Sequence, residues 1–155
     1  MRHDVAVLVR PGSVDDLPGL AAVFRRAVLT NEGDRGLLSK HPELTDHDPP
    51  AADDVVFVAE VTGRLVGFAT ARALDDETLA VTDLFVDPDY MRLGVGRALI
   101  DAVVAAATKR GRTRIEVEAN RHAVAFYGRV GFVEVEEVQL EFGTALRMVM
   151  SLPVP

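Results

Sequence analysis

Two glycines at the junction of an apolar strand and a helix constrain the fold more than any other feature of this sequence. Residues 78–86 have the pattern of a buried strand, which ends at Asp87-Pro88. Gly94 then opens a helix whose apolar positions recur at helical spacing up to a stop at Gly111. Free N–H groups at the helix start, with no Cβ at Gly94 or Gly96, favour an anion such as a phosphate.

The glycine pair can be compared with two common phosphate-binding motifs. A P-loop requires a Gly-Lys-Ser/Thr triplet, which is absent from this stretch. A dinucleotide-binding fold requires a third small residue where Leu99 stands, at the start of a doubly wound sheet. Close packing of the helix on the sheet would also select glycine, so phosphate binding and packing both remain open.

The remaining periodicity predicts an α+β fold with a mixed sheet. We expect strands over residues 5–10, 55–61, 65–74, 78–86, 114–119, 132–142 and 146–152. The last two form a hairpin that turns at Gly143-Thr144. We expect helices over residues 14–29, behind a capping box at Ser13 to Asp16, over 94–110 and over 123–130. The polar segment 31–54 holds a short helix at most, within a loop.

Composition places limits on the chemistry. For a chain of 155 residues with 48% apolar side chains we expect a single domain over residues 1–155. The absence of cysteine excludes disulfides and an acyl-cysteine intermediate, and four scattered histidines predict no metal site. The longest apolar run, residues 102–107, is too short for a membrane span, so we expect a cytoplasmic protein without a membrane partner.

Charge is distributed unevenly along the chain. The net charge of −7 disfavours nucleic acid as a partner. Residues 1–80 carry eight basic and fourteen acidic side chains, whereas residues 87–130 carry eight basic and five acidic ones. The first part suits a cationic ligand and the second a phosphorylated one, although both could be ordinary solvated surfaces. The acidic residues of the expected loop are Glu32, Asp34, Glu43, Asp46 and Asp48.

Two blocks of sequence carry a family resemblance. The first, residues 84–99, reads Leu-Phe-Val-Asp-Pro-Asp-Tyr-Met-Arg-Leu-Gly-Val-Gly-Arg-Ala-Leu, and the second, residues 120–132, reads Asn-Arg-His-Ala-Val-Ala-Phe-Tyr-Gly-Arg-Val-Gly-Phe. In this order and spacing, they resemble the GCN5-related N-acetyltransferase (GNAT) family. The resemblance implies a mostly antiparallel sheet of about seven strands with about four helices, its central strands splayed to admit acetyl-CoA.

The resemblance also implies which residues bind this cosubstrate. Backbone groups near Leu84 and Val86 would pair with the pantetheine arm, N–H groups from Arg92 to Arg97 would hold the pyrophosphate, and Asn120 would reach the pantetheine amide. Met91 stands where the family usually has Arg or Gln, so we expect altered pyrophosphate binding that Arg92 compensates. The full expected set is Leu84, Phe85, Val86, Met91, Arg92, Leu93, Gly94, Val95, Gly96, Arg97, Asn120, Ala123, Phe126 and Tyr127.

Attack of an amine on a thioester requires a base, an oxyanion donor and an acid for the leaving thiolate. Tyr127 is the expected general acid, since a phenol is a weaker acid than a thiol; as a core aromatic it would have no such role. Glu118 or Asp83 is the expected general base, with Glu118 preferred because it shares a strand face with Asn120. A solvated carboxylate is the alternative for each.

The expected function is direct transfer of an acetyl group from acetyl-CoA to a primary amine of a small, cationic acceptor. Two alternatives remain open: a non-catalytic acyl-CoA-binding sensor, and a peptide or protein N-acetyltransferase. The closing strands also suggest a homodimer.

Overall fold

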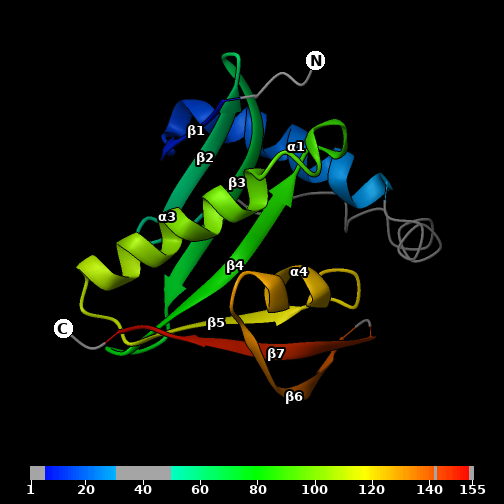
Figure 1. The fold of residues 1–155 in the computed structure, drawn as a ribbon. Helices are drawn as coiled ribbons and strands as arrows, with labels where there is room; N and C mark the ends of the chain where they lie inside the picture. Colours follow the sequence, from blue (N-terminus) through cyan, green and yellow to red (C-terminus); the bar gives the residue numbers. More distant parts are fainter. Residues whose placement is uncertain (1–5, 31–49, 142, 154–155) are drawn as a thin grey trace.

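The computed structural model describes residues 6–30, 50–141 and 143–153. Within these ranges, seven strands form one sheet with three α-helices and two short 3₁₀ turns (Figure 1). In chain order, the elements are β1 (Val7–Pro11), η1 (Val14–Asp16), α1 (Leu17–Thr30), β2 (Val55–Val61), β3 (Arg64–Ala73), β4 (Thr78–Val86), η3 (Pro88–Tyr90), α3 (Val95–Lys109), β5 (Arg114–Ala119), α4 (Val124–Arg129), β6 (Val133–Leu140) and β7 (Gly143–Ser151). The predicted mixed α+β sheet is confirmed.

The strand order is β1-β2-β3-β4-β5-β7-β6. All neighbours pair antiparallel except β4 and β5, which run parallel because α3 crosses between them. The meander predicted from residues 55–86 is present as β2, β3 and β4. The short helix considered within residues 31–54 falls largely on residues 31–49, which lie outside the described ranges.

Several element ends differ from the sequence prediction by a few residues, and two of the differences change the local structure. The expected first turn of the helix over residues 14–29 is the 3₁₀ turn η1, where the Ser13 N–H donates to the Asp16 carboxylate at 2.8 Å. The hairpin does not turn at Gly143-Thr144, because Gly143 already pairs with Leu140 at the start of β7. Gly143 has a φ of +115°, so the left-handed conformation belongs to the residue that begins the returning strand.

The helices cover opposite faces of the sheet. In one core cluster α1 packs Leu20 and Val23 against Val58 and Phe68. In the other, α3 packs its buried face against β2 to β5, joined by Tyr127 of α4. Figure 1 shows α3 crossing in front of the sheet, α1 behind it, and α4 above the end of β5. The sheet therefore separates an α1 face from an α3/α4 face, and any site within a gap of the sheet opens to both.

Candidate active site

The parallel strands β4 and β5 form the predicted gap. They pair only from Thr78 to Val81 on β4 and from Arg114 to Val117 on β5. Beyond these residues β4 continues to Val86 in register with β3 alone, and Figure 1 shows the two strands diverging toward their C-terminal ends. The central strands are therefore splayed, as the family resemblance implied.

The backbone of the diverging part of β4 presents unpaired groups to the gap. The Asp87 N–H donates to the Val66 carbonyl on β3 at 2.7 Å. Because successive residues of a strand direct their backbone groups to alternate sides, Phe85 also faces β3, whereas Leu84 and Val86 face the gap. An extended ligand can thus form β-like hydrogen bonds with these two residues.

A small cavity of about 110 Å³ lies in the gap. It brings together residues from three elements that the sequence predicted separately. Its lining comprises Val81, Thr82, Asp83, Leu84, Phe85, Val117, Glu118, Ala119, Asn120, Ala123 and Tyr127. Both base candidates and the acid candidate therefore contribute to one site.

The loop that enters α3 has the backbone conformation of an anion site. Arg92 and Gly94 have positive φ values of 65° and 82°. The first helical hydrogen bond runs from the Ala98 N–H to the Gly94 carbonyl at 3.0 Å. Among the described residues, the N–H groups from Arg92 to Arg97 donate to no backbone carbonyl, so six donors are available to an anion.

The two glycines of this loop serve different purposes. A Cβ at Gly94 would meet nothing within 4 Å, so glycine is favoured there by its positive φ and not by packing. A Cβ at Gly96 would lie 3.1 Å from the Phe126 ring, so glycine there permits α3 to approach α4. Packing, one of the two sequence alternatives, therefore accounts for Gly96, and backbone conformation accounts for Gly94. Phosphate binding at this loop stays a prediction.

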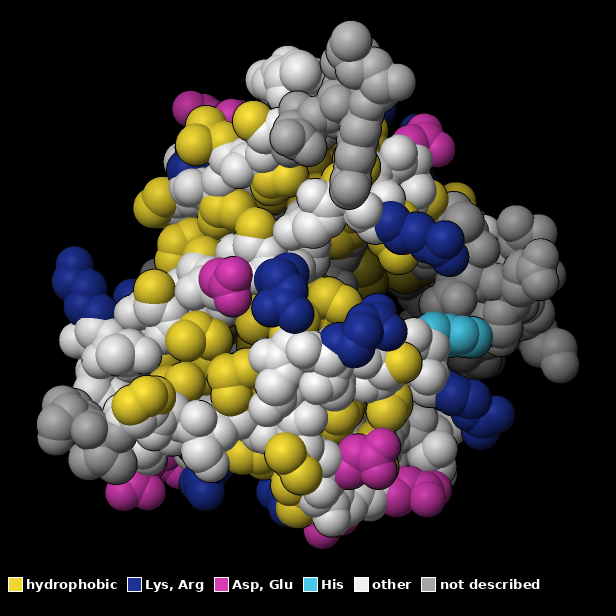
Figure 2. Space-filling view, in the orientation of Figure 1, with side chains coloured by type: hydrophobic (Ala, Val, Ile, Leu, Met, Phe, Trp, Pro, Cys, Tyr) yellow, Lys and Arg dark blue, Asp and Glu magenta, His cyan; other side chains and the backbone are white. Residues whose placement is uncertain are grey.

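Basic side chains surround this loop. Arg92 and Arg97 are exposed, and Arg97 donates to the Arg129 carbonyl at 3.3 Å. Figure 2 shows Lys and Arg side chains around a hollow on the face that carries α3 and α4. Met91 is 59% exposed and Leu93 40% exposed, so apolar surface also borders the loop.

Sequence reasoning did not identify the anchor that holds the start of the loop. The Asp87 side chain is buried, caps η3 by accepting the Asp89 N–H at 3.0 Å, and accepts from Arg26 of α1 at 3.1 Å. The Asp-Pro pair is a recognisable helix-start signal, but its partner Arg26 lies 61 residues earlier. Asp87 thus ties α1 to the loop on the opposite face.

Tyr127 lies on the α3/α4 side of the gap. Its side chain is 5% exposed, and its ring packs edge-on against Phe126 and Phe132 at centroid distances of 5.2 and 5.3 Å. Burial, and secondarily the negative charge of Asp83, raise the pKa of Tyr127 well above its usual range. The phenol is therefore protonated throughout the neutral range.

Asp83 lies on the α1 side of the gap. It pairs with Thr70 on β3, two positions from Phe85, which packs against the α1 cluster. The Thr70 hydroxyl, itself buried, donates to the Asp83 carboxylate at 2.5 Å. Sequence reasoning missed Thr70 because nothing in a single strand indicates which neighbour stands opposite.

Glu118 also faces the α1 side, since Val117 and Ala119 on either side of it belong to the α3 cluster. Its neighbour Glu116 pairs with Arg147 at 3.1 Å, and Arg147 pairs with Glu136 at 2.7 Å. Glu118 is exposed and has no hydrogen bond or ion pair with any described residue.

Asn120 has a local structural role. Its side-chain oxygen accepts the Ala123 N–H at 3.0 Å, in the turn that leads into α4. The amide NH₂ is the part of this side chain left to reach a ligand. Among the residues that the structure describes, no group of three His, Asp or Glu side chains is placed to hold a metal.

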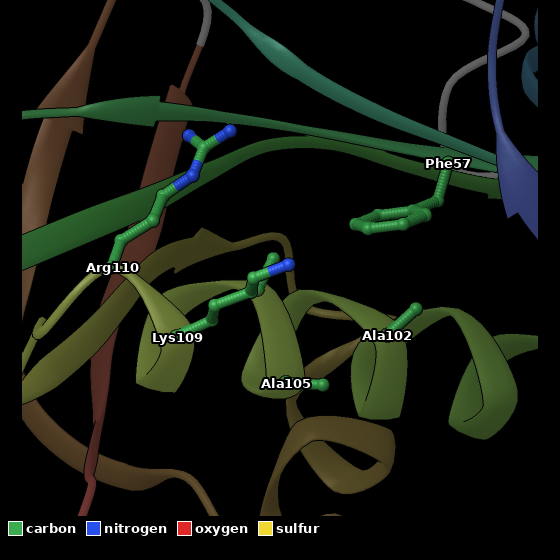
Figure 3. Close-up of a pocket in the computed structure, with 6 residues that line it drawn as sticks. Phe57, Ala102, Ala105, Lys109 and Arg110 are labelled. Carbon is green, nitrogen blue, oxygen red and sulfur yellow. The ribbon is translucent and has the colours of Figure 1, made fainter.

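A larger hollow lies away from the gap. It measures about 620 Å³ and lies between Phe57 on β2 and the outer surface of α3. Figure 3 shows the Phe57 ring facing α3 across the hollow, with Ala102, Ala105 and Lys109 along the helix. Among the residues that the structure describes, its lining includes neither a carboxylate nor a tyrosine, which acyl transfer would require. None of the described helices is long and apolar enough to cross a membrane.

Two proteins that are similar to this chain in sequence are both named as N-acetyltransferases. An uncharacterized N-acetyltransferase of Methanocaldococcus jannaschii is 38% identical over 96 residues, which cover 56% of this chain and 42% of that protein. The [ribosomal protein bS18]-alanine N-acetyltransferase of Escherichia coli is 36% identical over 75 residues, which cover 46% of this chain and 50% of the relative. The matched segments thus span half or less of these two relatives' lengths.

Solved structures share the whole fold. The crystal structure of the E. coli ribosomal-protein-S18-alanine N-acetyltransferase has a TM-score of 0.74 at 23% identity and covers 97% of this chain and 96% of its own. The PaiA N-acetyltransferase of Thermoplasma acidophilum, solved in complex with coenzyme A, has a TM-score of 0.71 at 18% identity, with 94% and 99% covered. The model of the acetyltransferase (GNAT) family matches residues 27–132. With the splayed strands and the open N–H loop, this match shows that the chain belongs to the GNAT acetyltransferase family.

Proposed function

We propose that this protein transfers an acetyl group from acetyl-CoA to a primary amine. The observation that carries the proposal is the open backbone on β4, where Leu84 and Val86 face the gap, together with the free N–H groups of residues 92–97 in the loop that follows this strand. A pantetheine arm would extend the sheet along these two residues and lead to a pyrophosphate at the loop. Membership of the family supports acetyl-CoA as the cosubstrate.

The two faces of the gap would hold the two substrates. Tyr127 and the loop lie on the α3/α4 side, where acetyl-CoA would enter. Asp83 and Glu118 lie on the α1 side, where the amine would approach. The thioester carbon would then stand between a proton acceptor on one side and a proton donor on the other.

The chain supplies each group that direct transfer requires. A carboxylate, Glu118 or Asp83, accepts the proton of the amine, and the nitrogen attacks the thioester carbon. A backbone N–H of Leu84 or Val86 would stabilise the oxyanion, a contribution typically worth about 3 kcal/mol. The C–S bond then breaks, and the Tyr127 hydroxyl protonates the departing thiolate. With no cysteine in the sequence, an acyl-cysteine route is excluded.

Two measurements test the function. Titration calorimetry with acetyl-CoA should give saturable heat, and acetyl-CoA should raise the melting temperature. Thiol release should then be followed with polyamines, aminoglycosides, amino acids and peptides. Absence of both heat and thermal stabilisation contradicts the cosubstrate assignment, whereas tight binding without turnover of any amine identifies a sensor.

We infer a small, cationic acceptor as the first candidate. Asp83 and Glu118 on the α1 side of the gap would attract a positive charge. The acidic residues Glu32, Asp34, Glu43, Asp46 and Asp48, which first suggested such an acceptor, lie outside the described residues.

A peptide N-terminus is the second candidate. The E. coli relative that matches over 75 residues is named for acetylation of an alanine of a ribosomal protein. An alanine-starting peptide therefore belongs in the acceptor panel. A kcat/KM at least about tenfold above that of the best polyamine would favour this candidate over the first.

We further propose a homodimer through the edge strand β6. Val133 and Val135 on this strand are 68% and 53% exposed. Glu134, Glu136 and Glu137 share the edge, so two copies would repel one another and added salt should strengthen association. Sedimentation velocity at low and high salt tests this, and a monomer under both conditions contradicts it.

A further inference from the structure

A chain of hydroxyl groups fixes the Asp83 carboxylate. The Thr70 hydroxyl donates to the Asp83 carboxylate at 2.5 Å, and the oxygens of Thr70 and Thr82 are 2.6 Å apart. A hydroxyl has one proton, and that of Thr70 is given to Asp83. Thr82 must therefore donate to Thr70, and the chain runs from Thr82 through Thr70 to Asp83.

An irregularity in the sheet makes this chain possible. The register of β3 and β4 shifts between Thr70 and Ala71, so that Thr70 pairs with Asp83 while Ala71 pairs with Val81. Thr82 is the extra residue on β4, and both it and Asp83 lie within reach of the same hydroxyl. A regular ladder would place Thr82 and Asp83 on opposite faces.

Asp83 is held more firmly than the other base candidate. Thr70 is 1% exposed and has little freedom to move, whereas Glu118 is exposed and has no bonded partner among the described residues. The other charged or titratable groups that face Asp83 in the described structure are Arg72 on β3, Glu118 on β5 and Tyr127 on α4. Preorganisation favours the carboxylate whose position is fixed before substrate binds.

We propose that Thr70 is a positioning residue, whose buried hydroxyl directs Asp83 to take the proton of the acceptor amine. This inference rests on the proposed acetyl transfer. The amine N–H bond breaks and its proton joins the Asp83 carboxylate, while the nitrogen forms a bond with the acetyl carbon. The C–S bond breaks and the thiolate takes the Tyr127 proton.

The cycle closes because Asp83 and Tyr127 line the same cavity. After transfer, Asp83 is a neutral acid and Tyr127 a phenolate, and passage of one proton between them restores both groups. The negative charge of Asp83 contributes to the raised pKa of Tyr127, which is the electrostatic sign of this proximity. Glu118 on the far strand then remains free to attract the positive charge of the acceptor.

The decisive test compares Thr70→Val with Thr70→Ser. Valine has the shape of threonine without the hydroxyl, and Thr82 is exposed enough to bond with water instead, so Thr70→Val should fold. We expect Thr70→Val to lower kcat about tenfold and to move the acid limb of the kcat/KM profile to higher pH. Thr70→Ser should stay within about twofold of the wild type in both measurements.

Companion variants complete the design. Asp83→Asn should lower kcat about 10²-fold and Glu118→Gln should mainly raise the KM of the amine. Thr144→Val, an exposed threonine on β7, is the matched control and should change neither kcat nor the profile. Acetyl-CoA affinity and melting temperature are measured for every variant.

The outcomes separate this inference from the proposed function. A wild type that binds no acetyl-CoA or acetylates no amine in the panel overturns both. An active wild type with Thr70→Val unchanged in kcat and profile overturns the role of Thr70 alone. The role of Thr70 is also contradicted if Thr70→Ser lowers kcat as much as Thr70→Val does. It is contradicted as well if acetyl-CoA affinity falls in parallel with kcat in Thr70→Val, or if Glu118→Gln lowers kcat more than Asp83→Asn does.

Discussion

The two sides of the gap between β4 and β5 are built from different parts of the chain. On the α3/α4 side, the loop at residues 92–97 presents backbone N–H groups, and its arginine side chains are exposed. On the α1 side, the chemistry belongs to side chains, with Asp83 held by Thr70 and Glu118 across from it. A backbone site tolerates changes of side chain and depends on conformation, whereas a side-chain site depends on individual groups.

This contrast accounts for the departure at Met91. The side chain is 59% exposed beside a loop whose donors are main-chain groups. Replacement of the family's usual Arg or Gln therefore removes at most one side-chain contact from the proposed pyrophosphate site. Tyr127 and Asp83 have no such redundancy.

The largest expected effect is on Tyr127, where one hydroxyl is proposed to do the chemistry. Tyr127→Phe should lower kcat about 10²-fold and leave acetyl-CoA affinity within about twofold, since the packed ring remains. The raised pKa keeps the phenol protonated, so wild-type activity should not fall between about pH 7 and about pH 9.5 through loss of this proton.

Tyr90→Phe is the matched control, because Tyr90 is the other tyrosine of the chain and stacks under Arg64 outside the gap. Stopped assays of thiol release and calorimetry separate the two parameters. Equal losses of kcat and affinity for Tyr127→Phe would mean that the hydroxyl binds the cosubstrate and does not act as an acid.

The proposed backbone site at residues 92–97 can be tested by comparing two glycines that have the same backbone conformation. Gly94 and Gly63 have φ values of 82° and 81°, and a Cβ at either would meet nothing within 4 Å. Alanine at each position should cost about 1–2 kcal/mol of folding stability through the same strain. Gly94→Ala alone should also weaken acetyl-CoA binding, about five- to tenfold, because relief of the strain turns N–H groups away from the anion.

Thermal unfolding and calorimetry on the Gly94→Ala and Gly63→Ala variants give the comparison directly. If both alanine variants bind acetyl-CoA as the wild type does, the conformation at Gly94 is not required by the cosubstrate.

The loop at residues 92–97, where backbone groups form the proposed site, was easier to predict from sequence than the α1 side of the gap, where side chains do. The spacing of Gly94 and Gly96 after a buried strand predicted an open helix start, because the backbone conformation of a loop depends mainly on the residues within it. The meander from Val55 to Val86 was equally evident from alternating side chains and polar turns.

The side-chain network could not be predicted in the same way. The bond between Thr70 and Asp83 depends on a register shift between two strands, and the bond between Arg26 and Asp87 spans 61 residues. The face of Glu118 was predictable from strand alternation, but its lack of a partner depends on how Arg147 divides between Glu116 and Glu136. Such contacts are properties of the assembled sheet.

A smaller effect is expected where a side chain supports the backbone site. Asp87→Asn keeps an oxygen for the Asp89 N–H but removes the charge that pairs with Arg26 at 3.1 Å. The loop should become less well fixed, and acetyl-CoA affinity should fall about two- to fivefold with kcat unchanged.

Asp75→Asn is the matched control for this variant, because Asp75 also accepts backbone N–H bonds in a turn, at 2.8 and 2.7 Å, but away from the gap. Calorimetry on both variants measures the difference. A fall in kcat without a change in acetyl-CoA affinity would instead mean that Asp87 supports the side chains that act in the transfer.

The smallest effect on activity is expected from a contact outside both sides of the gap. Arg10 forms two hydrogen bonds of 2.9 Å with Asp16 and one of 3.0 Å with Glu60, and its bonds lower the pKa of Asp16 from 3.8 to about 2. Since the folded-state pKa is the lower one, this stabilisation is present above about pH 4 and is lost as the pH falls toward about 2.

Arg10→Gln should therefore lower the melting temperature by a constant few degrees from about pH 5 to about pH 8, and its melting curve should converge with that of the wild type near pH 2. Both kcat and acetyl-CoA affinity should be unchanged at neutral pH, because the contact joins β1 and β2 to η1 and reaches neither the loop nor the gap. A loss of turnover in Arg10→Gln would show that the edge of the sheet influences the site, and the division into a backbone side and a side-chain side would then be incomplete.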